Sequence, residues 1–226
     1  MVRSPLRRAK SSVTALRREA EELDDEAEPI FPARENVSRL KSGPGPRKLS
    51  APEIGAAHHK FLQQVALGAL DTPGGLAAEA GRLVRENYLS QDEGAVLDMD
   101  ALEAFWNSPL GHKIRAHAAD VRRELPFTAR FSPAELAKIT GTETGAGLEQ
   151  EFVVVQGVAD LLVLQPREIW LVDFKTDEVA RGEMPKKIKI YSPQLQLYAA
   201  ALERTFSRPV TLRALHFLAA GRTEEI

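Results

Sequence analysis

The sequence of 226 residues contains no cysteine. This absence excludes disulfide bonds, thiolate zinc sites, iron–sulfur clusters and cysteine nucleophiles, and it agrees with a reducing compartment. No apolar run reaches the roughly 18 to 20 residues of a membrane span, and the basic start lacks the apolar segment of a secretory signal. We therefore expect a soluble, cytoplasmic protein with no membrane partner.

The sequence also lacks an excess of either charge and a phosphate-binding loop. Its 30 basic and 32 acidic residues give a formal charge of −2, so any attraction to nucleic acid must come from local patches. The pattern G-x-x-x-x-G-K-[ST] does not occur, so the chain alone cannot be a helicase. Hydrophobic residues make up 43%, as in an ordinary globular domain.

The chain divides near residue 50. Residues 1–50 predict a charged helix over 12–24, followed by a linker rich in proline and glycine over 28–50. Residues 51–226 predict one domain with a single core. Helical spacing of apolar residues there predicts helices over 52–70, 75–88 and 98–119, the last interrupted near "NSPLG".

The second half of the domain predicts a sheet. Strands are expected over 121–131, 151–165 and 168–175, and "PVTLRALHFLAA" closes with another strand. Ser132 and Glu135 have the spacing of a capping box that starts a short helix, and a longer helix is expected from about Pro193 to Phe206. The pattern predicts an α/β fold: a mixed β-sheet core flanked by helices, with an N-terminal helical arm.

Three ionisable residues interrupt the apolar strands in "QGVADLLVLQPREIWLVDFKTDE". Strand alternation places Asp173 and Lys175 on one face, which a structural ion pair alone would explain. The turn between the strands returns Asp160 beside Asp173, and neighbouring carboxylates repel unless a proton or a cation lies between them. A divalent cation is favoured, and Mg²⁺ suits two carboxylates, a backbone carbonyl and water.

A lysine beside such a cation would not bind the metal. It can orient or deprotonate a water molecule and stabilise charge on a phosphate oxygen. Two acids that hold a metal, together with one lysine, form an arrangement suited to the hydrolysis of phosphodiesters.

The same stretches resemble a known family. "GVADLLVL" followed by "IWLVDFKTD" resembles the PD-(D/E)XK nuclease superfamily, in which an aspartate precedes a D-x-K strand end. "SSVTALRR", "IGAAHHKFLQQ" with its G-x-x-x-H pattern, "RRELPF" and "YSPQLQLYAAAL" with its Q-x-x-x-Y pattern follow the order of its RecB/AddA-type branch, the C-terminal nuclease domain of bacterial helicase-nucleases. The resemblance implies a restriction-endonuclease-like fold.

The resemblance also implies a set of metal ligands. These are His59, Asp160, Asp173 and the backbone carbonyl of Phe174. Gly55 aligns the histidine position with His59, whereas His58 points about 100° away on a helix. An imidazole ligand also suits Mn²⁺, so either metal fits.

Other residues have one interpretation from the family and another without it. Gln194 and Tyr198 lie four apart on a helix; the resemblance implies that they cover the catalytic strands and contact DNA or order Lys175, whereas an ordinary helix would have a core tyrosine and a solvated glutamine. Glu124 extends the metal shell or binds a water molecule, or else pairs with Arg122 or Arg123.

The remaining candidates lie before the last helix or match no motif. The sequence leaves two interpretations of Lys186, Lys187, Lys189 and Tyr191. They form either an edge that contacts the phosphates along a nucleic-acid strand and stacks on its bases, or an ordinary solvated surface. A structural role is expected for His112, His117 and His216.

The resemblance implies a Mg²⁺-dependent deoxyribonuclease of the exonuclease type, acting on single strands that a helicase motor supplies during double-strand-break repair. A non-catalytic DNA-binding or docking module is the alternative, although clustered acids would repel the phosphates that it must bind. A free-standing nuclease for RNA or phage DNA is a third hypothesis. Because "AAGRTEEI" follows closely on a core strand, we expect an excised domain or a truncated gene.

Overall fold

The computed structural model describes residues 48–141, 152–180 and 182–226. The predicted charged helix over 12–24 and the linker up to residue 47 lie outside these residues. Among the described residues, no helix is both long enough and apolar enough to cross a membrane.

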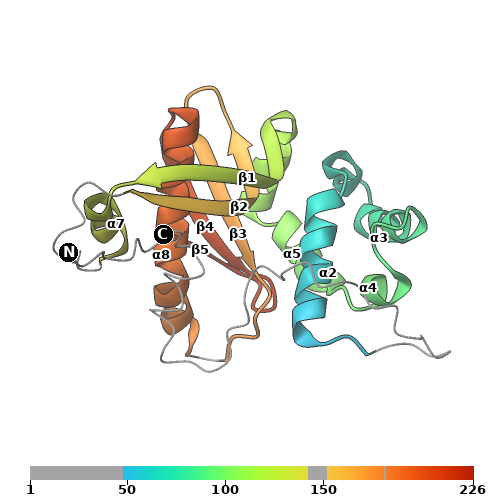
Figure 1. Ribbon diagram of the computed structural model, residues 1–226. Coiled ribbons are helices and arrows are strands. Elements are labelled where there is room, and N and C mark those ends of the chain that lie inside the picture. Colours follow the sequence, from blue (N-terminus) through green and yellow to red (C-terminus); the bar gives the residue numbers. More distant parts are fainter. Residues whose placement is uncertain (1–47, 142–151, 181) are drawn as a thin grey trace, which may run out of the picture.

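Five strands form one mixed sheet, in which they lie side by side in chain order (Figure 1). The strands are β1 (Val121–Phe131), β2 (Val153–Leu164), β3 (Ile169–Lys175), β4 (Val210–Phe217) and β5 (Arg222–Glu225). All neighbours are antiparallel except β3 and β4, which are parallel. The predicted mixed sheet is confirmed, whereas β5 was not predicted because its residues Arg-Thr-Glu-Glu show no apolar alternation. The strand β1 forms one edge of the sheet and carries Pro126 near its middle.

The helices of the first half come before the sheet. They are α2 (Ala51–Gln64), α3 (Gly75–Arg85), α4 (Gln91–Ala95), α5 (Met99–Trp106) and α6 (Pro109–Ala116), with short 3₁₀ helices η1 (Leu67–Asp71) and η2 (Ala118–Asp120). The predicted helix over 52–70 ends at Gln64, and η1 follows it. The break near "NSPLG" is confirmed, because Ser108 caps α6 by accepting a hydrogen bond from the N–H of Gly111.

Two helices come from the second half of the chain. The helix α7 (Pro133–Thr140) starts with the predicted capping box of Ser132 and Glu135. The helix α8 (Met184–Phe206) starts nine residues before the predicted Pro193, which lies inside it. Proline removes one backbone donor from a helix, which favours a break. The helix nevertheless continues, and the hydroxyl of Ser192 donates to the carbonyl of Ile188 in the same turn.

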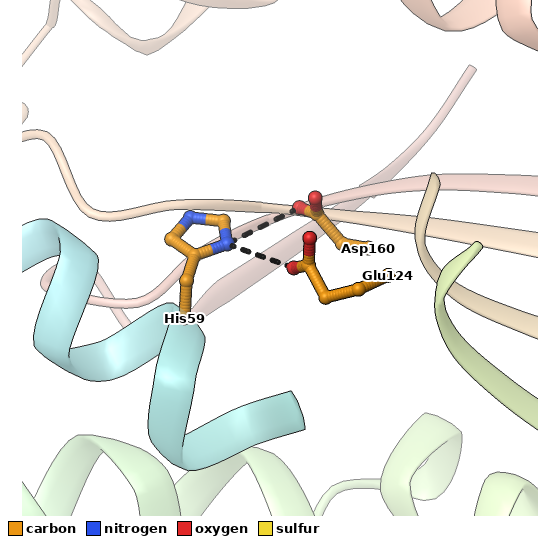
Figure 2. A group of neighbouring side chains, drawn as sticks. All are labelled: His59, Glu124 and Asp160. Carbon is orange, nitrogen blue, oxygen red and sulfur yellow. Dashed lines mark ion pairs between the residues drawn. The ribbon is translucent and has the colours of Figure 1, made fainter. Parts of the chain in front are cut away.

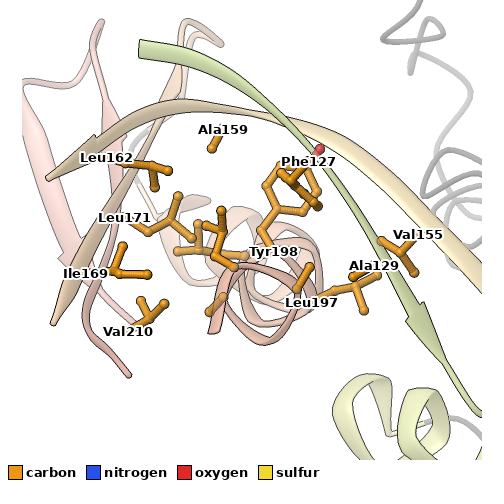
Figure 3. Close-up of a cluster of buried hydrophobic side chains, with 14 of the residues drawn as sticks. Phe127, Ala129, Val155, Ala159, Leu162, Ile169, Leu171, Leu197, Tyr198 and Val210 are labelled. Atoms are coloured by element: carbon orange, nitrogen blue, oxygen red, sulfur yellow. The ribbon is translucent and has the colours of Figure 1, made fainter. Parts of the chain in front are cut away.

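The sheet separates two hydrophobic clusters. On one face α8 packs on residues such as Leu162, Ile169 and Leu171 (Figure 3). On the other face the helices of the first half pack on Val172 and Phe174 of β3. The strand β3 is therefore covered on both faces, as its continuous apolar run predicts.

The side-chain alternation of β1 and β2 changes phase at one position. Ala159 belongs to the cluster under α8, whereas Leu161, two residues later, belongs to the opposite cluster. Along β1, Leu125 belongs to the cluster under α8, whereas Val121 belongs to the opposite cluster. Because side chains two apart in a regular strand share a face, both strands must twist sharply between these residues. Glu124, which lies at the break, has a φ of 46°.

A clamp joins β1 to the end of α2 beside this break. One nitrogen of the Arg123 guanidinium donates to the carbonyls of Gln63 and Val65, at 2.9 and 2.6 Å. These carbonyls belong to the last turn of α2 and to its C-cap residue Val65, where a helix has no intrahelical donors for them. The neighbouring carbonyl of Gln64 accepts from Arg82 at 3.1 Å. Arg123 therefore fixes the helix to the strand one residue away from Glu124.

We expect Arg123→Ala to lower the free energy of unfolding by about 1 to 3 kcal/mol, because it leaves part-buried carbonyls without donors. Urea denaturation followed by circular dichroism measures this loss. The matched control is Arg122→Ala, since Arg122 is exposed and, within the described part of the chain, donates to the nearby carbonyls of Ala119 and Val121. That control should change the free energy by no more than about 0.5 kcal/mol. Equal losses in both variants would contradict the clamp.

Candidate active site

The helix α2 places His59 beside strands β2 and β3. A Cβ atom added at Gly55 would lie 2.7 Å from Oγ1 of Thr176, just beyond the end of β3. Only glycine permits so close an approach without a shift of the helix or the threonine. Gly55 and His59 lie one turn apart and share a helix face, so the close contact at Gly55 brings His59 over the strand ends.

Three side chains from three elements converge there. His59 Nδ1 lies 3.7 Å from Asp160 Oδ2 and 4.0 Å from Glu124 Oε1 (Figure 2). Among the residues that the structure describes, these three form the group whose ligand atoms all lie within 4.8 Å of one another. The phase change of β1 and β2 makes this possible, because it leaves Glu124 opposite Asp160, between the pairs Arg123–Leu161 and Leu125–Ala159.

Asp160 is held in place by a backbone donor. Its Oδ2 accepts a hydrogen bond of 2.8 Å from the N–H of Phe174. Burial raises the pKa of Asp160 well above its usual range, and the charge of Asp173 raises it further. The N–H of Phe174 and the charge of Lys175 act in the opposite direction. The carboxylate therefore sits where its negative charge is poorly compensated.

Glu124 and His59 are perturbed by the same surroundings. Burial, with a smaller contribution from Asp173, raises the pKa of Glu124. Burial lowers the pKa of His59, against an opposing effect of Asp173. The site therefore favours a neutral imidazole, which is the form that binds metals. His58 takes a structural position instead, because its Nδ1 lies 2.8 Å from the carbonyl of Ile54 and its Nε2 accepts from the N–H of Asp98.

Asp173 and Lys175 form an ion pair beside this group. Lys175 Nζ lies 2.9 Å from Asp173 Oδ2, and both side chains are largely buried, with exposures of 12% and 7%. The same ammonium donates to Oε1 of Gln194 at 3.5 Å, a long hydrogen bond. The amide of Gln194 in turn donates to the hydroxyl of Tyr198 at 3.2 Å. The predicted pair on α8 thus lies over the D-x-K strand end and reaches the lysine.

A glycine makes room for Tyr198. A Cβ atom at Gly157 of β2 would lie 2.6 Å from Phe127 and 2.9 Å from the Tyr198 ring, and these two rings pack edge to face 4.8 Å apart. The small residue on the strand therefore allows the aromatic ring of the helix to lie close against the sheet.

The predicted DNA-binding residues fall into two groups. Lys186 and Lys189 are exposed on the first turns of α8. Lys187 is partly buried and lies 3.7 Å from Asp177 Oδ2. Tyr191 differs from the expected stacking residue, since it is 6% exposed and its ring faces Lys175. Tyr191 lies within α8, which starts earlier than predicted, and it belongs to the hydrophobic cluster between this helix and the sheet.

The three other histidines lie outside the group. His112 contacts Arg115 on α6, and the ring of His117, at the end of α6, packs against Trp170 of β3. His216 is buried between Phe105 and Phe174, and burial lowers its pKa to about 4. Two features near the site were not predicted from the sequence. One is the pair of hydrogen bonds from Arg123 to the end of α2, and the other is the position of Asp177 close to Lys187. Only the closeness of Asp177 to Lys175 in "DFKTDE" could have suggested the latter.

The donors around His59 fit a divalent cation. Two ligands bound at about 2.1 Å to one octahedral ion lie about 3 Å apart at a right angle and about 4.2 Å apart in line. The spacings of 3.7 and 4.0 Å lie between these two values, so the side chains would close on a bound ion by shifts on the order of half an ångström. One imidazole with carboxylates suits both Mg²⁺ and Mn²⁺. A cation would also compensate the charges that raise the pKa of Asp160.

Comparison with known proteins agrees with this geometry. A family model described as the PD-(D/E)XK nuclease superfamily matches residues 33–223. The mixed five-stranded sheet with flanking helices is consistent with the restriction-endonuclease-like fold that the sequence implied.

Relatives of this chain carry a common name. An ATP-dependent helicase/nuclease subunit of Moorella thermoacetica is 32% identical over 216 residues, which cover 94% of this chain. The proteins of that name from Heliobacterium modesticaldum and Bacillus cytotoxicus are 35% and 31% identical and cover 78% and 94% of it. The matched region is 15%, 12% and 17% of the three relatives' lengths.

We expect Asp160→Asn to raise the stability of the metal-free protein at neutral pH. The raised pKa means that folded Asp160 resists ionisation, whereas the unfolded carboxyl ionises freely, so the charge costs stability above a pH of about 4. Asparagine removes this cost and keeps an oxygen for the N–H of Phe174. With a chelator present, the free energy of unfolding should rise on the order of 1 kcal/mol at pH 7.

The gain from Asp160→Asn should disappear as the pH falls through 4, because the carboxyl is then protonated in both states. The control is Asp100→Asn, an exposed acid in the first turn of α5, which should give no gain at any pH. Denaturation curves of both variants across this pH range make the comparison. A loss of stability at pH 7 in Asp160→Asn would show that the aspartate is not under electrostatic stress.

Proposed function

Because the chain belongs to the PD-(D/E)XK nuclease superfamily, we propose that it is a metal-dependent deoxyribonuclease that hydrolyses phosphodiester bonds. The observation that carries the proposal is the convergence of His59, Glu124 and Asp160 beside the ion pair of Asp173 and Lys175. A docking module would have no use for clustered carboxylates, since they repel the phosphates of DNA.

His59, Glu124 and Asp160 would hold the metal, with Asp173 and the carbonyl of Phe174 at the edge of its shell. The backbone of Phe174 supports this assignment, since its N–H donates to Asp160 at 2.8 Å and so holds this strand end against the proposed ligand. A bound Mg²⁺ or Mn²⁺ would supply a more acidic water and offset charge on the phosphate. The sequence left open whether Glu124 extends the metal shell, and its distance of 4.0 Å from His59 favours its inclusion.

Lys175 would act on the water and the phosphate, not on the metal. Its ammonium is held beside Asp173, so it lies next to the proposed metal shell with N–H groups to donate. We assign it the orientation of the attacking water and the stabilisation of charge on the phosphate oxygens. Gln194 would keep the ammonium in this position, and Tyr198 would keep Gln194 in turn.

The substrate and partner are inferred from the relatives, whose name combines a helicase with a nuclease. We propose that this chain cleaves single-stranded DNA, in exonuclease fashion, as a helicase motor delivers it during double-strand-break repair. Lys186 and Lys189, exposed on α8, are the proposed contacts for phosphates. Lys187 would contribute less because it already pairs with Asp177.

Asp173→Ala should lower the rate of cleavage of single-stranded DNA in Mg²⁺ or Mn²⁺ by about 10³-fold or more, because it removes a carboxylate at the metal shell and the ionic partner of Lys175, and so disturbs the two cations that offset charge on the phosphate. The measurement is release of a fluorescent label from an oligonucleotide, with and without a chelator. Asp100→Ala is the matched control and should cleave at the wild-type rate. Wild-type and Asp173→Ala proteins of equal activity would refute the proposal, and metal-independent DNA binding without cleavage would favour the docking module.

Lys175→Ala and Asp160→Ala should separate two roles. Lys175→Ala should lose turnover by about 10²-fold or more but keep its affinity for Mn²⁺ within a few-fold, since lysine contributes no metal bond. Asp160→Ala should lose both. Isothermal titration with Mn²⁺ and single-turnover cleavage give the two quantities. If metal affinity fell equally in the two variants, it would be wrong to assign Asp160 as a metal ligand and Lys175 as the residue that orients the water.

A further inference from the structure

Tyr191 lies directly beside the active-site lysine. Its ring centroid is 4.2 Å from Lys175 Nζ, which is within the distance of a cation–π interaction. The residue is 6% exposed, so water does not screen this contact strongly. The hydroxyl donates to Asp177 Oδ2, and the ring lies 6.2 Å from that of Phe217. Contacts at both ends of the tyrosine thus fix the orientation of its ring.

Three different groups surround the ammonium of Lys175. Asp173 provides a carboxylate, Gln194 an amide oxygen and Tyr191 an aromatic face. The side chain of lysine is flexible and its ammonium has no preferred plane, so one partner cannot define its position. The bond to Gln194 is long, at 3.5 Å, and leaves much of the positioning to the other two groups.

We propose that Tyr191 is a positioning residue that holds the Lys175 ammonium against Asp173. The inference rests on the proposed function, in which Lys175 handles the attacking water. Tyr191 does not touch the substrate in this role; its electron-rich face attracts the ammonium at 4.2 Å. The predicted stacking of Tyr191 on DNA bases is replaced by this internal contact.

Asp177 helps to fix the orientation of the Tyr191 ring that faces Lys175. It lies two residues after Lys175, where the chain leaves β3, and it accepts the hydroxyl of Tyr191, which lies on α8. Lys187, one helical turn before Tyr191, lies 3.7 Å from the same carboxylate oxygen and offsets its charge. The tyrosine, the aspartate and the active-site lysine therefore form one closed set of contacts between β3 and α8.

Tyr191→Leu and Tyr191→Phe provide the first test. Tyr191→Leu removes the aromatic face, and we expect a loss of about tenfold in turnover, the size expected for a partly desolvated cation–π contact, with the KM for single-stranded DNA unchanged within about twofold. Tyr191→Phe keeps the face but loses the hydroxyl bond to Asp177, so its turnover should lie between those of the wild type and Tyr191→Leu. A loss as large in Tyr191→Phe as in Tyr191→Leu would overturn the proposal.

A series of fluorinated rings isolates the electrostatic effect from packing. Replacement of Tyr191 by phenylalanine and its mono-, di- and trifluorinated derivatives reduces the attraction of the ring for cations with little change in shape. We expect the logarithm of turnover to fall steadily along the series. Equal turnover in all members would overturn the proposal while leaving the nuclease assignment intact, because the unsubstituted protein and its Asp173→Ala control report on that assignment separately.

Crystal structures of Tyr191→Leu and Tyr191→Phe decide the same point without any cleavage assay. The proposal expects the Lys175 ammonium to leave Asp173 in Tyr191→Leu and to stay at about the 2.9 Å of the wild type in Tyr191→Phe. An ammonium that remains in place in Tyr191→Leu would refute the positioning role. This result is independent of whether the protein is a nuclease.

Discussion

The burial of neighbouring carboxylates, Asp160 and Glu124 beside Asp173, is the constraint on which the site depends. Burial raises the pKa of Asp160 and of Glu124, and repulsion from the charge of Asp173 raises both further, so ionisation of these groups costs stability. The fold must hold them with rigid parts that do not relax. The paired twist of β1 and β2, the contact of Gly55 with Thr176 and the Arg123 clamp supply this rigidity. Functional sites are commonly built at some cost in folding stability.

Most of the sheet could be predicted from the sequence, because alternation and apolar runs mark strands directly. The predicted strand over 121–131 coincides with β1, and the D-x-K strand end lies where expected. The choice of His59 over His58 came from the G-x-x-x-H pattern of the family resemblance, since the angle between successive helical residues shows only that one of the two can face the site. The structure places His59 beside the acids and His58 in contact with backbone groups. The roles of these residues in catalysis remain predictions.

Two features depended on contacts that no local pattern encodes. Proline at position 193 favoured a helix start there, and the true start at Met184 places Tyr191 under the sheet, so a residue expected on the surface became part of the interior. The other is Glu124, for which a salt bridge with Arg122 or Arg123 competed with a metal role. Both arginines donate to backbone carbonyls instead, and only the positive φ of Glu124 brings its carboxylate to His59.

The proline in the middle of β1 has a consequence for how the protein behaves among its own copies. An edge strand of 11 residues presents a row of backbone groups on which another chain could extend the sheet. Pro126 has no N–H, so it interrupts that row, and a ring on the exposed edge hinders a second strand from approaching. Pro126 thereby opposes aggregation through the exposed edge of β1. Because β1 also carries Glu124, a shift in its register would separate Glu124 from His59 and Asp160.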